Sequence, residues 1–304
     1  MKTIAGYLKE YIVGVEKPVL ALSALFIALA IFVNYYHGLN RHISTLSDPG
    51  QFGSWYAVFL SAFSFPYLLA QAGGRKRYFH YPRFVALLLI APALFAWKMA
   101  FTSQFAFSPH LYENAYWNQV ADWPFKLLVF LAALLLLWRV FDRDQPFYGL
   151  TTRGFHAKPY LLMLLLMLPL LAAASTQPDF LAVYPKLKNI LYLSGRHSNP
   201  FYQLLYELAY GSDFLSIELF FRGFMVLAFA RWAGRDAILP MALFYCTIHF
   251  GKPLGECISS FFGGLILGVV TYHTRTILGG LVVHLGIAWL MELGGYLGNN
   301  MHHS

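Results

Sequence analysis

Long apolar stretches separated by short polar segments run through the whole chain. Nine of them have, or nearly have, the roughly 20 mostly apolar residues that a helix needs to cross a bilayer. They lie at about 18–36, 52–74, 84–106, 124–141, 159–175, 201–229, 236–250, 256–273 and 277–297. The pattern predicts an all-α fold, a polytopic transmembrane helix bundle of about 8–9 spans.

The segments around these stretches predict the organisation of the chain. Residues 1–17 carry an apolar run shorter than a signal-peptide core, so we expect an amphipathic segment that leads into the first span. Residues 1–175 are predicted to form an N-terminal scaffold of about five spans, and residues 176–200 a loop. Residues 201–304 are predicted to form a transmembrane core that carries the polar site.

The composition supports a bilayer environment and excludes other classes of protein. Only 12% of the residues are charged, whereas a soluble domain has about 25%. So few charges cannot cover a water-exposed surface. The net charge of +8 does not gather in a stripe of Lys and Arg, so we expect no nucleic-acid partner. Cys246 and Cys257 are too few for a disulfide framework.

The basic residues predict an orientation, because cytoplasmic loops of membrane proteins are enriched in Lys and Arg. With the N-terminus inside, the inside segments carry 14 of the 22 basic residues and the outside segments carry 5. We therefore predict a multi-pass membrane protein with a cytoplasmic N-terminus.

Acidic residues are distributed unevenly over the predicted spans. The first five spans contain no Asp or Glu, whereas the last four contain Glu207, Asp213, Glu218, Glu256 and Glu292. An ionisable group at bilayer depth costs about 2.5–3.5 kcal/mol on insertion scales and commonly marks a functional site. The last third of the chain is therefore predicted to hold the site.

One stripe of the predicted helix 201–229 carries three ionisable residues. Glu207 and Glu218 are eleven residues apart, about three helical turns, and Arg222 follows Glu218 at the i+4 spacing of an ion pair. Arg222 either neutralises Glu218 so that the helix can insert, or holds an ionised Glu218 as a metal ligand or general base. Asp213 projects from another face, where we expect a helix-packing hydrogen bond.

Two histidines complete the candidate site. His249 comes at the end of a predicted helix, just before a Gly-Lys-Pro break, and His284 lies among small residues of a later helix. His249 alone is more typical of a hydrogen bond at a helix end, and His284 alone fits a hydrogen bond between helices as well as a metal site. Together with one or two glutamates they predict a site for a divalent metal, in particular Zn²⁺. This ion takes imidazole and carboxylate ligands and keeps one position for water at catalytic sites.

These residues resemble the motifs of the CPBP family of intramembrane metalloproteases, which includes the type II CAAX prenyl proteases and abortive-infection-like proteins. The resemblance covers about residues 201–297. It implies a helical membrane bundle with a conical cavity, in which acids and histidines position a water, with a divalent metal, to hydrolyse a peptide bond. The matching positions are the Glu-x-x-x-Arg pair, the aromatic-x-x-x-His pair and the third-motif histidine: Glu218, Arg222, Tyr245, His249 and His284.

Two positions depart from the family pattern. Ile217 stands where the family has a leading glutamate that activates the water, and Ala288 stands where the family has a polar residue four positions after the last histidine. Glu256 follows His249 by seven residues, and Glu292 follows the last histidine by eight. We expect one of these acids, Glu256 before Glu292, to supply the missing function.

The sequence supports three hypotheses about function. The leading one is a metal-dependent endopeptidase of a bacterial-type cytoplasmic (inner) membrane, acting on a membrane-associated or lipidated peptide. In it, His249, His284 and Glu218 are metal ligands, and Glu218, Arg222 and Glu256 are catalytic residues. The second, favoured by the two apolar replacements, is an inactive relative that serves as a membrane chaperone, immunity or assembly protein. The third is a transporter or proton relay, but the chain shows no inverted repeat.

Overall fold

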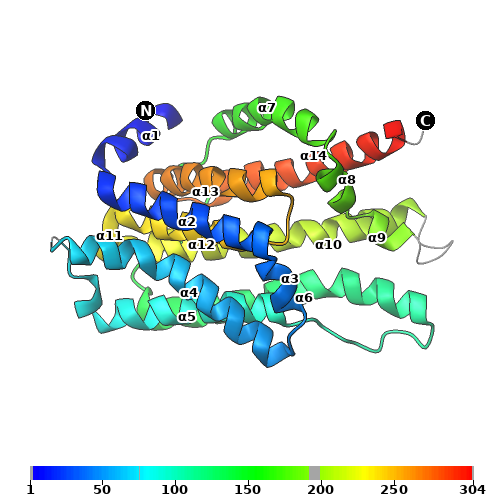
Figure 1. The fold of residues 1–304 in the computed structure, drawn as a ribbon, viewed down its shortest axis with the longest axis horizontal. Coiled ribbons are helices and arrows are strands. Elements are labelled where there is room, and N and C mark those ends of the chain that lie inside the picture. Colours follow the sequence, from blue (N-terminus) through cyan, green and yellow to red (C-terminus); the bar gives the residue numbers. More distant parts are fainter. Residues whose placement is uncertain (1–2, 75, 192–198, 303–304) are drawn as a thin grey trace. The chain divides into compact units, whose positions relative to one another are not determined.

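The computed structural model describes residues 3–74, 76–191 and 199–302, and its ribbon is drawn in Figure 1. Every regular element in these residues is a helix, which confirms the prediction of an all-α fold. The chain divides into two compact units, each of which takes segments from both halves of the sequence. Unit 1 comprises Met1–Phe101, Leu136–Phe155 and Leu219–Ile277, and unit 2 comprises Thr102–Leu135, His156–Glu218 and Leu278–Ser304.

Unit 1 contains most of the helices. They are α1 (Ile4–Gly14), α2 (Lys17–His37), α3 (Leu39–Ser44), α4 (Asp48–Ala72), η1 (Tyr78–His80), α5 (Pro82–Ala100), η2 (Phe147–Gly149), η3 (Leu219–Ala228), α11 (Ala230–Ala233), η4 (Gly234–Ala237), α12 (Ile238–Thr247) and α13 (Leu254–Thr274). Helices α2, α4 and α5 each begin with a proline in the first turn, where its missing N–H costs nothing. Gly38, with a φ of 69°, ends α2.

Aromatic side chains hold the core of unit 1 together. The rings of Phe59 on α4 and Phe244 on α12 stack with centroids 4.7 Å apart, and those of Phe95 on α5 and Phe221 on η3 lie 5.1 Å apart. Helix α12 is at the centre of this packing, because all ten of its residues are buried.

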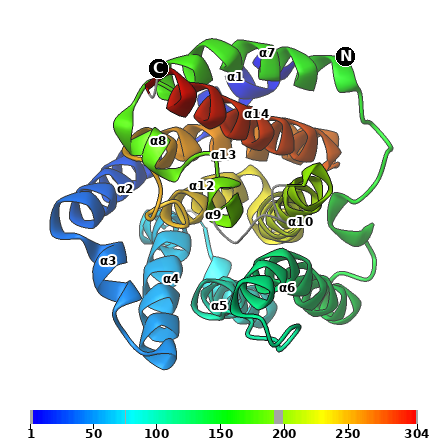
Figure 2. The same cartoon turned by 90° about the vertical axis from the view of Figure 1, so that its right-hand side faces the viewer.

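Unit 2 contains the remaining helices. Its elements are α7 (Ala157–Ala174), α8 (Pro178–Val183), α9 (Lys188–Leu191), α10 (Pro200–Glu218) and α14 (Leu278–His302), and it includes most of α6 (Leu111–Phe141), which continues into unit 1. Helices α7 and α14 lie side by side in both ribbon views (Figures 1 and 2). Gly279 and Gly286 on α14 allow this close approach, because a Cβ at either position would collide with Tyr160 or Leu164 of α7.

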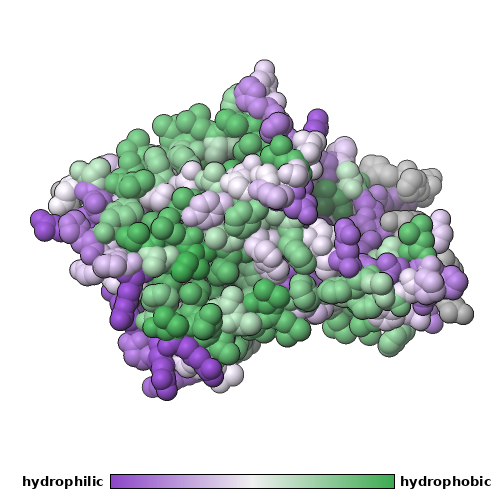
Figure 3. Space-filling model, turned by 90° about the horizontal axis from the view of Figure 1, so that it is seen from below, coloured by the Kyte–Doolittle hydropathy of each residue, from purple (hydrophilic) through white to green (hydrophobic). Residues whose placement is uncertain are grey.

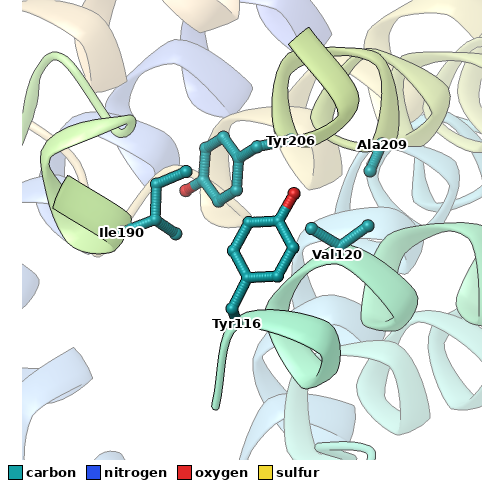
Figure 4. Close-up of a cluster of buried hydrophobic side chains, with 5 residues drawn as sticks. All are labelled: Tyr116, Val120, Ile190, Tyr206 and Ala209. Atoms are coloured by element: carbon teal, nitrogen blue, oxygen red, sulfur yellow. The ribbon is translucent and has the colours of Figure 1, made fainter. Parts of the chain in front are cut away.

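A cluster of buried side chains joins α6, α9 and α10 within unit 2 (Figure 4). Its members are Tyr116 and Val120 on α6, Ile190 on α9, and Tyr206 and Ala209 on α10. The hydroxyl of Tyr116 donates to the carbonyl of Tyr202 at 2.8 Å, so the buried polar atom is satisfied.

The predicted loop 176–200 contains two short helices, α8 and α9. Its residues 192–198 lie outside the described part of the chain.

Seven helices of the described residues are long and apolar enough to cross a membrane: Lys17–His37, Asp48–Ala72, Pro82–Ala100, Leu111–Phe141, Ala157–Ala174, Leu254–Thr274 and Leu278–Met301. Each corresponds to one of the predicted spans. Apolar residues also cover a large part of the face drawn in Figure 3, and α7 buries only Tyr160. These features support a bilayer environment. The other two predicted spans correspond to α10 with η3 and to the ten-residue helix α12.

One predicted span ends earlier than expected and the next begins earlier. The helix predicted at 84–106 ends at Ala100, and the helix predicted at 124–141 begins at Leu111. The reason is a stripe of polar residues on α6, spaced four apart, that binds an extended segment. The backbone N–H groups of Ser103, Phe105 and Phe107 donate to the side chains of Asp122, Asn118 and Asn114 at 2.7–3.1 Å.

Candidate functional site

An acid–histidine pair lies in unit 2. Glu218 is the last residue of α10 and is 0% exposed. His284 on α14 approaches it, and its Nδ1 lies 3.0 Å from Glu218 Oε1. The distance corresponds to a hydrogen bond in which the imidazole N–H donates to the carboxylate. The structure therefore brings together two of the residues that the sequence predicts for the site.

Two neighbouring residues fix the geometry of this pair. Gly280 lies one turn before His284 on the same face of α14, and a Cβ at this position would collide with Glu218 Oε2. The ring of Phe214, one turn before Glu218 on α10, packs against the His284 ring with centroids 4.7 Å apart. The Glu218 carboxylate therefore lies against the backbone of Gly280, and the Phe214 ring packs against the His284 imidazole.

The two apolar replacements in the family motifs lie next to the pair. Ala288 is 4% exposed and belongs to a cluster with Tyr210 and Phe214, against which Ile217 packs. Both positions that carry polar residues in the family are therefore part of one apolar cluster here. Any water-activating group must come from another residue than 217.

In unit 1, Tyr245 contacts both of the other predicted motif residues. The guanidinium of Arg222 lies 4.1 Å from the centroid of the Tyr245 ring, a cation–π contact inside the protein, since Arg222 is 0% exposed. The His249 ring lies against the same tyrosine, with centroids 4.8 Å apart. The aromatic-x-x-x-His spacing therefore places one ring between an arginine and a histidine.

Both histidines use Nδ1 to bind an oxygen. His249 Nδ1 lies 2.8 Å from the carbonyl oxygen of Tyr245, and His284 Nδ1 binds the Glu218 carboxylate. A proton on Nδ1 leaves the lone pair on Nε2. Metal-binding and catalytic histidines commonly have this arrangement, because the oxygen partner fixes the tautomer and the orientation of the ring.

The segment after Glu218 is not an ordinary α-helix. Residues Leu219–Ala228 form the π-helix η3, and all ten are buried. π-Helical turns are rare and occur frequently at functional sites. The α-helical i+4 spacing from which the sequence predicts a Glu218–Arg222 ion pair does not describe this segment, and that ion pair stays a prediction.

The remaining predicted acids have local partners. Glu256, in the first turn of α13, forms an ion pair with Lys252 at 3.6 Å. Glu292 is 7% exposed and accepts hydrogen bonds from the backbone N–H groups of Lys186 and Leu187 at 2.9 and 3.2 Å. Glu292 thus connects α14 to the segment after α8, and its carboxylate has a structural role. Asp213 accepts a hydrogen bond from Ser216 on its own helix at 3.0 Å.

The comparison with known families bears on the same region. A sequence profile described as "Type II CAAX prenyl endopeptidase Rce1-like" matches residues 209–290. This match supports membership in the CPBP/CAAX protease family. At the level of the family it supports an intramembrane endopeptidase of the CAAX type, and with the seven apolar helices it indicates a multi-pass membrane protein. Searches of curated proteins and of solved structures gave no match.

The residues of this pair fit part of a metal-binding set. Glu218 and His284 supply a carboxylate and an imidazole, which are donors that zinc takes. Within the described parts of the chain, no three His, Cys, Asp or Glu side chains are grouped so as to hold one ion. The metal therefore stays a proposal, with His249 as the further ligand that the sequence predicts.

Sequence reasoning missed the residues that support the Glu218–His284 pair. Gly280 and Phe214 carry no chemistry of their own, and only the contact between α10 and α14 gives them a role. The available signal was the spacing, since Gly280 precedes His284 by four residues and Phe214 precedes Glu218 by four. Residues four apart lie on one face of a helix.

Proposed function

We propose that the chain is a CAAX-type intramembrane endopeptidase that cleaves a membrane-associated or lipidated peptide. The observation that carries this proposal is the hydrogen bond between the buried Glu218 and His284 within the segment matched by the family profile. A buried carboxylate in contact with an imidazole can accept and return a proton.

The pair suits the proton transfers of peptide hydrolysis. Hydrolysis adds the oxygen of a water to the carbonyl carbon, breaks the C–N bond and delivers a proton to the leaving nitrogen. In our proposal Glu218 takes the proton from the water and later gives it to the leaving nitrogen. The N–H of His284 holds the carboxylate in position throughout. Glu256 is proposed as the acid that assists in place of the missing glutamate, and Arg222 as the cation that keeps the site's carboxylate ionised.

We further propose a divalent metal, with Zn²⁺ first, bound by His249, His284 and Glu218. Such an ion polarises a carbonyl group and makes water a stronger acid when it is bound. The bond of His249 Nδ1 to a backbone carbonyl, which leaves Nε2 as the metal-binding atom, supports this proposal.

Metal analysis of the purified chain tests the metal proposal. We expect close to one divalent ion per chain, and its loss in His249→Ala and in His284→Ala. The matched control is His42→Ala, since His42 is exposed on α3 and lies outside the motifs. A metal-free protein, or a metal content that neither motif variant changes, would contradict it.

Hydrolysis in water labelled with heavy oxygen tests the endopeptidase proposal itself. The full chain in proteoliposomes is incubated with a prenylated peptide that ends in a CAAX sequence, and the products are weighed by mass spectrometry. The expected products are the two fragments, with labelled oxygen in the new carboxyl group. Intact peptide after prolonged incubation would contradict the proposal.

A second candidate function is a catalytically inactive relative that acts as a membrane chaperone, immunity or assembly protein. The packing of Ala288 and Ile217 in one apolar cluster favours it, because both positions carry polar groups in the family pattern and apolar side chains here. In that case Glu218→Gln should retain full function in cells. The endopeptidase proposal predicts that this variant loses it.

A further inference from the structure

A polar cavity lies in unit 1. Its volume is about 340 Å³. It opens where the N-terminal helix α1 meets the segment after α4, the turn η4 and the end of α13, elements that lie at one end of unit 1 in Figure 1. No residue of the family motifs lines it.

The lining of this cavity carries both signs of charge. Lys76 and Arg235 supply cations, and Glu10, Glu16 and Asp236 supply carboxylates. Asp236 is held within the lining, since Lys76 Nζ lies 3.4 Å from Oδ2 and the hydroxyl of Tyr78 donates to the same oxygen at 2.8 Å. Among the residues that the structure describes, the lining thus has one more carboxylate than it has Lys and Arg side chains. A purely anionic ligand would not match it.

Two buried tyrosine hydroxyls point to a missing ligand. Tyr11 is 5% exposed and Tyr67 is 1% exposed, and neither hydroxyl has a hydrogen-bond partner among the residues that the structure describes. A buried hydroxyl without a partner costs free energy. Burial first and the nearby Asp236 second raise the pKa of Tyr11, so this hydroxyl remains a donor at neutral pH.

A narrow apolar crevice of about 20 Å³, with room for about one water molecule, adjoins the cavity. It is lined by Val15, which follows α1, by Val19 of α2, and by Pro66 and Ala70 near the end of α4, and it also reaches Tyr67. The crevice shares Tyr11, Glu16 and Asp236 with the polar cavity. Helix α2 begins and helix α4 ends beside the cavity, and both are candidate spans. We therefore expect the polar cavity at the level where these spans leave the bilayer.

We propose that this cavity binds the headgroup of a zwitterionic aminophospholipid. The phosphate would lie between Arg235 and the hydroxyl of Tyr11, and the ammonium would lie by Glu10 and Glu16. The guanidinium of Arg235 is positioned for this, because it lies against α1 at Gly14, one turn after Tyr11, where any Cβ would collide with it. Phosphate and guanidinium form strong charge-assisted hydrogen bonds.

Native mass spectrometry of the full chain in detergent tests the proposal. The chain is titrated separately with phosphatidylethanolamine, phosphatidylglycerol and glycerophosphoethanolamine. We expect one phosphatidylethanolamine to bind more tightly than either other compound. Tyr11→Phe should weaken that binding about tenfold, the value of a hydrogen bond to a charged group. Tyr36→Phe should leave it unchanged, since Tyr36 is 73% exposed and lies outside the lining.

Three results would overturn the proposal. Equal binding of phosphatidylethanolamine and phosphatidylglycerol would contradict recognition of the ammonium group. Binding by Tyr11→Phe at the level of Tyr36→Phe would contradict this location. Glycerophosphoethanolamine binding as tightly as the lipid would identify a soluble headgroup compound as the ligand. Should Tyr11→Phe fail to fold, Glu16→Gln replaces it, and this variant is expected to lose the preference for the aminophospholipid.

Discussion

Gly280 and His284 present one face of α14 to the Glu218 carboxylate, and each controls a different property of it. His284 donates a hydrogen bond to one oxygen, and Gly280 leaves the space that the other oxygen occupies. At the scale of the residue, the site therefore depends on the lack of a side chain at Gly280 as much as on the polar side chains of Glu218 and His284.

Gly280→Ala should disable the site while leaving both of its polar residues in place. The added Cβ has to displace the Glu218 carboxylate, and a displacement of about 1 Å at a reacting group can lower a rate about 100-fold. The measurement is the initial rate of peptide hydrolysis. Gly263→Ala is the control, because a Cβ there meets nothing within 4 Å. Equal rates for the two variants would show that the position of Glu218 does not matter.

The residue types at the site were predictable, but their partners were not. The acids stood out because charges are rare in a membrane span, and the sequence predicted Glu218, His249 and His284 on that ground. Which acid meets which histidine depends on how α10 packs on α14, and side-chain spacing within one helix contains no information on that. For the same reason Glu292 was predicted as a candidate acid, although two backbone N–H groups occupy its carboxylate.

At the scale of the element, α12 and α13 pack closely through small residues. A Cβ at Gly268 on α13 would lie 2.6 Å from Met241 and 3.1 Å from Ile238 on α12. The sulfur atoms of Cys246 on α12 and Cys257 on α13 lie 3.9 Å apart in the same interface, and both cysteines are buried.

Gly268→Val should destabilise the chain, because the larger side chain over-packs this interface at a cost of about 1–3 kcal/mol. Thermal unfolding in detergent should show a lower midpoint for this variant. Gly263→Val, on the same helix, adds the same side chain where no atom stands in its way, so it separates over-packing from helix propensity. Matching midpoints for the two variants would refute close packing of α12 against α13.

Hydropathy predicted most elements, and its failures have physical causes. A helix buried in protein and a helix exposed to lipid are equally apolar, so the ten-residue helix α12 was predicted as part of a span. The π-helix η3 was predicted as α-helix, because over ten mostly apolar residues the two periodicities do not differ visibly. Polar side chains on α6 bind the extended segment after α5, and a count of apolar residues does not include such bonds.

At the scale of the whole molecule, unit 1 groups the segments that the basic residues assign to one side of the membrane. Lys76 pairs with Asp236 at 3.4 Å, and Arg231 pairs with Asp142 at 3.7 Å. The hydroxyl of Thr276 donates to the carbonyl of Thr151 at 2.6 Å. These contacts join the predicted inside segments to one another, in agreement with a single basic end.

Cysteine labelling in cells tests the proposed orientation. Thr152→Cys lies on the predicted inside and Ser47→Cys on the predicted outside, and both positions are exposed. An impermeant maleimide should label Ser47→Cys in intact cells and Thr152→Cys only after the membrane is opened. The native chain supplies the background control, since Cys246 and Cys257 are buried. The reverse labelling pattern would invert the orientation.

The most direct test of the central claim is the hydrolysis rate of Glu218→Gln against that of the native chain, measured with the same prenylated peptide. The substitution keeps the size of the side chain and removes the group that takes the proton. General acid–base groups contribute about 10²–10⁴-fold to a rate, so we expect a loss of at least about 100-fold with the thermal midpoint preserved. A folded Glu218→Gln that cleaves at the native rate would contradict the claim that the Glu218–His284 pair is the centre of a CAAX-type endopeptidase.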